Sequence, residues 1–293
     1  SAVHKLRPTL PIALMALTPA ELTTLDPRVD QNQRINVNKR LMWERAPASK
    51  GALGGLEDAW IWPFLWQGNT SLFTGLFKLV EDRLNVANDC KEGVQVILLV
   101  EDSVRFYSAY LPVLYGELYK TAAAISNETM GAKEKLMRMY SRPKVVLCTN
   151  YEEASDVFER YSDQLIGVIS DAGFPRDGTH DRNAGIALAR KILDERPDVP
   201  LLVQSAAGDD SDIAHQAHAL GARFVSKLSP SLLQQLRSFM VDDMSFGPLN
   251  FVDGLSGKPI GRVETVTQLM HTWERLPLSS VAHHAAACDL SRW

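Results

Sequence analysis

Short apolar runs alternate with segments of helical periodicity between residues 94 and 240, and this alternation most constrains the fold. The first run, at residues 94–100, reads VQVILLV, and the next, at residues 144–148, reads KVVLC. Three more lie at residues 165–169, 201–204 and 223–225, with helical patterns at residues 104–125, 151–161, 183–196, 211–220 and 230–240. Continuous apolar runs are typical of strands covered on both faces, and parallel neighbours need helical crossovers. The pattern predicts an α/β domain with a doubly wound, five-stranded parallel sheet.

Polar side chains follow four of these runs. Glu101 and Asp102 come after the first run, Asp171 after the third, Ser205 after the fourth and Lys227 after the fifth. Because the carboxyl ends of parallel strands meet at one edge of a sheet, we expect these side chains in one cleft. Two acids can hold a hard Mg²⁺ ion while a third attacks phosphorus, and a hydroxyl and an ammonium can bind the phosphoryl oxygens. The set predicts phosphoryl transfer to a carboxylate.

The phrases around these side chains resemble those of response regulator receiver domains, which have a flavodoxin-like fold. The phrases are VILLVEDS, ISDAGFPRDG, LLVQS and GARFVSK, and they stand in the receiver order over about residues 94–240. The resemblance implies a role for each matched position: Asp171 as the phosphoacceptor, Glu101 and Asp102 as the acidic pair that holds Mg²⁺, Gly173 as the donor of a backbone carbonyl to the metal, Ser205 as the switch hydroxyl, Lys227 as the pocket amine, and Phe224 as the switch aromatic.

Three features depart from the receiver pattern. Glu101 replaces the more common Asp, and Leu228 stands where Pro usually follows the lysine. The interval between Asp102 and Asp171 is also longer than in an ordinary receiver. We expect the excess to be an insertion near residues 126–142, which is charged and helix-compatible.

The flanking sequence resembles the amino-terminal regulatory region of proteins related to phosphoenolpyruvate synthase and pyruvate phosphate dikinase. The phrases FLWQGN, KLVEDRLN and FGPLNFVDGLSGKPIG carry this resemblance. Such proteins have tandem receiver-like modules ahead of a catalytic region. The resemblance implies that residues 1–88 are a partial or degenerate receiver-like module without an acidic pocket, residues 89–245 are the receiver domain, and residues 246–293 are an extension or linker toward a missing region.

The amino-terminal part has weaker patterns. Residues 11–17 and 59–65 are short apolar runs that predict buried strands, and capping residues from Asn69 predict a helix that ends near Asn85. The polar stretch at residues 26–58 has no assignable pattern. Because the chain begins with Ser1 and stops at Trp293 in mid-pattern, we expect it to be part of a longer protein.

Charge and cysteine content exclude several classes of protein. A net charge of −4 and a pI near 6.0 give no general attraction to nucleic acid or anionic membrane. The 3 cysteines show no disulfide or zinc-finger spacing, which favours the reducing cytoplasm. No apolar run in the sequence is long enough to span a bilayer.

We therefore expect a two-component receiver, not itself an enzyme, that takes a phosphoryl group on Asp171 from a histidine kinase or phosphotransfer protein. It would switch a partner or a downstream region related to phosphoenolpyruvate synthase. One alternative is a phosphorylation-incompetent scaffold or dimerisation module, and a homodimer stays open in either case. The other is a phosphohydrolase of the haloacid dehalogenase type, because Asp171 is followed by Asp177, Gly178 and Thr179. Those enzymes need an acid where this chain has Gly173.

Overall fold

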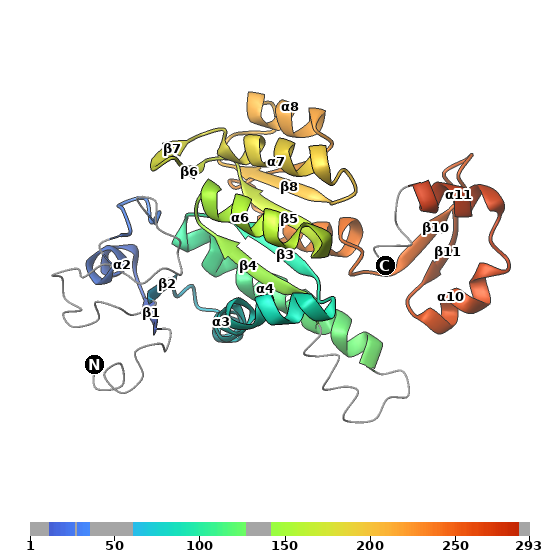
Figure 1. The fold of residues 1–293 in the computed structure, drawn as a ribbon, viewed down its shortest axis with the longest axis horizontal. Coiled ribbons are helices and arrows are strands. Elements are labelled where there is room, and N and C mark those ends of the chain that lie inside the picture. The colour runs from blue at the N-terminus through green and yellow to red at the C-terminus, as the bar shows by residue number, and fades with distance from the viewer. Residues whose placement is uncertain (1–11, 27, 36–60, 127–141, 287–293) are drawn as a thin grey trace.

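The computed structural model describes residues 12–26, 28–35, 61–126 and 142–286, and all structural statements below concern these residues (Figure 1). The predicted insertion lies almost wholly outside the described residues, as does most of the unassigned stretch at residues 26–58. No helix in the described ranges is long and apolar enough to cross a membrane.

The centre of the molecule is the predicted parallel sheet of five strands. In spatial order the strands are β4 (Lys144–Cys148), β3 (Val96–Val100), β5 (Leu165–Asp171), β8 (Leu201–Ser205) and β9 (Arg223–Ser226). Every neighbouring pair is parallel. Renumbered within the sheet, this is the order 2-1-3-4-5 of the flavodoxin-like fold, in which ligands bind where the strand order reverses. The predicted fold class is confirmed.

Helices connect the strands and cover both faces of the sheet (Figure 1). They are α4 (Val104–Ser126), α6 (Tyr151–Tyr161), α7 (Ala184–Glu195), α8 (Asp212–Ala219) and α9 (Leu232–Ser238), with short turns η2 (Ser162–Gln164) and η3 (Phe239–Asp243). Helices α4 and α9 pack together, while α6, α7 and α8 form a second layer. Because the sheet is covered on both sides, every residue of β3 is buried, which explains its continuous apolar run.

The amino-terminal part contains a second, two-stranded parallel sheet. Strands β1 (Ile12–Ala16) and β2 (Ile61–Leu65) pair in register, and α2 (Pro19–Leu25) follows β1. Helix α3 (Ser71–Asp89) packs against α4 and β4. One continuous hydrophobic core joins these elements to the central sheet. The amino-terminal elements are therefore packed onto the sheet domain.

The predicted end of α3 near Asn85 is wrong, because the helix continues to Asp89 and into the turn η1 (Cys90–Glu92). Val86 and Cys90 are buried in the core, so that the last turn of the helix is stabilised by packing. Gly93 then ends the segment with a φ of 81°, a left-handed conformation that glycine adopts without steric cost.

A small unit lies at the carboxyl-terminal end, where the sequence predicted no element. The antiparallel strands β10 (Leu249–Val252) and β11 (Pro259–Val263) pack with α10 (Val266–Trp273) and α11 (Leu278–Ala286) (Figure 1). This unit has its own core around Leu249, Phe251 and Val263. Residues 249–286 are thus an ordered unit, whereas Cys288 lies outside the described residues.

Candidate functional site

Three carboxylates converge at the carboxyl edge of the central sheet. Glu101 and Asp102 follow β3 directly, and Asp171 is the last residue of the neighbouring β5. One oxygen from each lies within 4.8 Å of the others, and all three residues are buried. The sequence predicted that these acids lie close together. They do so because β3 and β5 are parallel and end at the same edge of the sheet.

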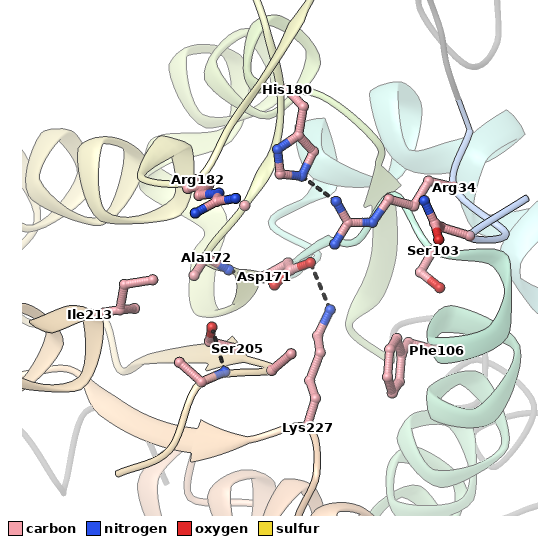
Figure 2. A pocket seen from close by; sticks show the side chains of 14 residues that line it. Arg34, Ser103, Phe106, Asp171, Ala172, His180, Arg182, Ser205, Ile213 and Lys227 are labelled. Carbon is pink, nitrogen blue, oxygen red and sulfur yellow. Dashed lines mark hydrogen bonds and ion pairs between the residues drawn. The ribbon is translucent and has the colours of Figure 1, made fainter. Parts of the chain in front are cut away.

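The ammonium of Lys227, just past β9, completes this cluster. Its Nζ lies 2.7 Å from Asp171 Oδ2 (Figure 2). The same atom lies 2.7 Å from Glu101 Oε2. It also lies 4.5 Å from the centre of the Phe106 ring, within cation–π range. Burial opposes the charged form of Lys227, but the carboxylates of Asp171 and Glu101 outweigh it and raise the pKa of the ammonium. Lys227 is therefore a fixed positive charge in the cluster.

Burial also acts on the acidic pair. It raises the pKa of Glu101 to about 7, with Lys227 pulling the pKa down and Asp171 pushing it up. The pKa of Asp102 is raised well above its usual value, first by burial and then by the neighbouring charges of Glu101 and Asp171. Three carboxylates beside one ammonium thus leave a site that favours a further positive charge.

The donor set fits a hard divalent cation. Both carboxylate oxygens of Asp102 are buried and accept no hydrogen bond from the described residues. Carboxylate oxygens are the ligands that Mg²⁺ prefers, usually one or two carboxylates together with waters. A buried carboxylate without a donor is costly, and a metal ion would remove that cost.

The remaining predicted residues line the same region. Ser205 ends β8, and its hydroxyl accepts a hydrogen bond of 3.1 Å from the amide of Ala207. Gly173 lies in the loop after Asp171 and lines the cavity with Ser205. Phe224 lies on β9 and is already buried, at 7% exposure, with its ring against His218. The metal, switch and phosphoacceptor roles of these residues stay predictions.

The cavity at this edge holds residues that the sequence did not single out. Its volume is about 680 Å³. Besides Asp171, Gly173, Ser205 and Lys227, its lining includes Asn32, Arg34, Ser103, Phe106, Ala172, His180, Arg182, Ala206, Ala207 and Ile213. Arg34 comes from the stretch without a pattern, so that no periodicity marked it. His180 follows the Asp-Gly dipeptide, which is a hairpin signal, and that signal could have placed it beside the loop that follows Asp171.

That hairpin also accounts for the phrase behind the phosphohydrolase alternative. Strands β6 (Phe174–Arg176) and β7 (Thr179–Asp181) are antiparallel, and Asp177 and Gly178 join them with φ angles of 51° and 75°. Two positive φ angles are what a tight hairpin of this kind requires, and Asp-Gly is a preferred pair for it. Asp177 does not line the cavity. The Asp-Gly-Thr phrase is thus explained by the turn.

Gly185 fixes how closely α7 approaches the loop that follows Asp171. A Cβ at this position would lie 2.0 Å from the carbonyl oxygen of Asp171 and 2.9 Å from the Cα of Ala172. The Gly185 amide donates a hydrogen bond of 2.9 Å to the Ala172 carbonyl. The first turn of α7 is therefore held against the backbone that carries Asp171.

Gly185→Ala should lower the free energy of unfolding by roughly 1–3 kcal/mol, the usual cost of overpacking, and should weaken Mn²⁺ binding at the acidic cluster. Thermal melting and Mn²⁺ titration measure the two effects. Gly116→Ala is the matched control, because a Cβ there meets no atom within 4 Å and alanine favours a helix. Equal melting temperatures and equal Mn²⁺ affinities of the two variants would show that the close approach of α7 to the Asp171 backbone affects neither property.

Comparison with known proteins finds similar solved structures but no match to a family model or a curated protein. Among solved structures, the chain is similar to a response regulator receiver domain protein from Clostridium thermocellum (15% identity, TM-score 0.32, covering 49% of this chain and 94% of that one). It is also similar to the non-phosphorylated HemR receiver domain from Leptospira biflexa (21% identity, TM-score 0.29, covering 49% and 94%). A third is the receiver domain of the histidine kinase CKI1 from Arabidopsis thaliana, complexed with Mg²⁺ and BeF₃⁻ (17% identity, TM-score 0.28, covering 53% and 96%).

The fold assignment above rests on the strand order of the chain itself. The relationship to proteins of the phosphoenolpyruvate synthase group stays a prediction.

Proposed function

We propose that this chain is a two-component receiver that accepts a phosphoryl group on Asp171. The observation that carries the proposal is the convergence of three buried carboxylates and one buried ammonium at the carboxyl edge of a 2-1-3-4-5 sheet. The oxygens of Asp102, which accept no hydrogen bond from any residue that the structure describes, add a reason for a cation to bind there. Mg²⁺ held by Glu101, Asp102, Asp171 and the Gly173 carbonyl would neutralise charge on the phosphoryl oxygens.

The reaction is a direct transfer to a carboxylate. The donor is a phosphorylated histidine of a histidine kinase or a phosphotransfer protein. A carboxylate oxygen of Asp171 attacks the phosphorus, an O–P bond forms, and the P–N bond breaks with its electron pair left on the imidazole nitrogen. Lys227 stays protonated and binds one phosphoryl oxygen, while the Ser205 hydroxyl turns from the Ala207 amide to donate to another.

Phosphorylation changes the conformation of β8, β9 and the helices that follow them. Phosphorylation adds roughly −1.5 to −2 charge beside Lys227 and Ser205. Movement of the Ser205 hydroxyl alters the packing between Phe224 on β9 and His218 on α8. A coupling of about 1–3 kcal/mol is typical between two sites and is enough for a partner, or a catalytic region of the parent chain, to sense the change. We infer a cytoplasmic protein, since Cys90 and Cys148 are both free thiols.

Beryllium fluoride with Mg²⁺ tests the proposal, because it mimics the phosphoryl group on an aspartate. We expect a bound ¹⁹F NMR signal in the wild-type protein and altered hydrogen exchange in residues 205–240. Asp171→Asn should lose both, while Asp177→Asn, an equal change on the hairpin turn, should keep both. A wild-type protein that gives no bound fluoride signal would instead be a phosphorylation-incompetent scaffold.

A further inference from the structure

Arg34 reaches the phosphoacceptor cavity from a segment far from the sheet domain in sequence. The segment forms one isolated β-bridge between Val29 and Ile35 and another between Arg34 and Ser103. The Ile35 amide donates a hydrogen bond of 2.8 Å to the carbonyl of Asp102, so that this segment touches the acidic pair through its backbone. Ile35 is also 1% exposed and belongs to the core.

Local hydrogen bonds fix the backbone of Arg34 itself. Its amide donates to Asp30 Oδ1 at 2.9 Å, and its carbonyl accepts from the Asp30 amide at 2.9 Å. The neighbouring Gln33 carbonyl accepts a hydrogen bond of 2.8 Å from the amide of Val104, the first residue of α4. The chain therefore presents the Arg34 side chain from a defined position.

The guanidinium lies beside the acidic cluster. Arg34 Nε is 3.9 Å from Asp102 Oδ1, and Arg34 Nη1 contacts His180 Nε2. In Figure 2 the Lys227 side chain points to Asp171 from below, and the Arg34 side chain enters the same cavity from the right, with its guanidinium toward His180.

The net charge of the site favours a second fixed cation beside Lys227. When all three carboxylates are ionised, as metal binding requires, Glu101, Asp102 and Asp171 against Lys227 give a surplus of about two negative charges, which Arg34 reduces to about one. With a divalent cation bound and Asp171 carrying a phosphoryl group, the site with Arg34 comes close to neutral. Without Arg34 it would keep about one excess negative charge beside the phosphoryl oxygens.

We propose that Arg34 is a ligand of the phosphoryl group on Asp171, so that the segment at residues 28–35 completes the pocket from outside the sheet. This inference rests on the proposed function. The planar guanidinium can donate two parallel hydrogen bonds to phosphoryl oxygens, which suits a site where Lys227 and Ser205 approach from another side. The amino-terminal segment is thereby a part of the phosphoacceptor site.

Binding of BeF₃⁻ in the presence of Mg²⁺ measures this role, with Mn²⁺ alone as a second probe. Arg34→Ala should weaken BeF₃⁻ binding roughly ten- to hundredfold, because a charge-assisted hydrogen bond is lost. The same variant should bind Mn²⁺ alone at least as tightly as the wild type, since a like charge near the metal position is gone. Arg34→Lys should retain part of the BeF₃⁻ affinity, and Arg160→Ala, an exposed change on α6, should retain all of it.

Two results in the variant would overturn the inference. One is an Arg34→Ala protein that binds BeF₃⁻ as tightly as the wild type. The other is equal loss of Mn²⁺ and BeF₃⁻ binding together with a lower melting temperature, which would show that Arg34 only holds the structure. If the wild-type protein itself binds no BeF₃⁻, the proposed function fails first and this inference fails with it.

Discussion

Lys227→Met should lower the free energy of unfolding by roughly 3–5 kcal/mol at pH 8, the usual cost of removing one partner from a buried ion cluster. The Lys227 side chain is 3% exposed and lies 2.7 Å from oxygens of both Glu101 and Asp171. Methionine fills a similar volume but leaves the carboxylates buried without their cation. The lower free energy of unfolding therefore reflects uncompensated negative charge and not the creation of a cavity.

The pH dependence of this loss follows from the raised pKa values. Glu101 has a pKa of about 7 in the folded protein against 4.5 as its ordinary value. The folded state thus binds more protons than the unfolded state between these limits, and the contribution of Glu101 to stability falls as pH rises through that window. Lys227 normally lowers the pKa of Glu101, so its removal extends the window to higher pH. The ammonium itself stays charged throughout, because its own pKa is raised.

Urea unfolding at pH 5 and pH 8 provides the measurement. At pH 5 Glu101 and Asp102 of the variant hold their protons, because their pKa values are raised, so we expect its deficit to be much smaller than at pH 8. Lys191→Met is the matched control, because Lys191 pairs with Glu159 at the surface, and this variant should show no such pH dependence. An equal deficit of Lys227→Met at both pH values would mean that packing, and not charge, explains the loss.

The central sheet and most of the candidate site could be predicted because both depend on local sequence. A strand buried on both faces is apolar at every position, as in VILLV of β3, and such a run needs no knowledge of its neighbours. Side chains that follow parallel strands meet for a topological reason, so Asp102 and Asp171 could be brought together from the strand order alone.

The contribution of Arg34 could not be predicted in the same way. A single arginine in a polar stretch has no periodicity, and its position depends on a backbone hydrogen bond between Ile35 and Asp102, residues far apart in the sequence. The extended end of α3 depends likewise on tertiary packing, since Val86 and Cys90 are held by the core rather than by helix propensity. Long-range contacts of this kind leave no local pattern.

A second buried ionic cluster joins α3 to the central sheet. Asp82, in the middle of α3, is fully buried. Its Oδ1 lies 2.7 Å from Arg142 Nη2, and its Oδ2 accepts hydrogen bonds from the Tyr115 hydroxyl at 2.8 Å and the Val145 amide at 2.9 Å. Burial opposes the charge on Arg142, but the hydrogen bonds that the guanidinium donates to Asp82 outweigh it and raise the pKa of Arg142. One carboxylate thus holds together α3, α4, β4 and Arg142, which lies two residues before β4.

Asp82→Ala should destabilise the protein by roughly 3–5 kcal/mol, because it leaves the Arg142 guanidinium buried without its carboxylate and removes acceptors from Tyr115 and Val145. Urea unfolding measures the loss, and Asp156→Ala, which removes an exposed pair with Arg160 on α6, should change stability far less. Because none of these residues lines the cavity at Asp171, the folded variant should still bind BeF₃⁻ with wild-type affinity. A loss no larger than that of Asp156→Ala would show that α3 is held by its apolar face alone. A loss of BeF₃⁻ binding in the folded variant would instead show that α3 also positions the acidic pair through α4.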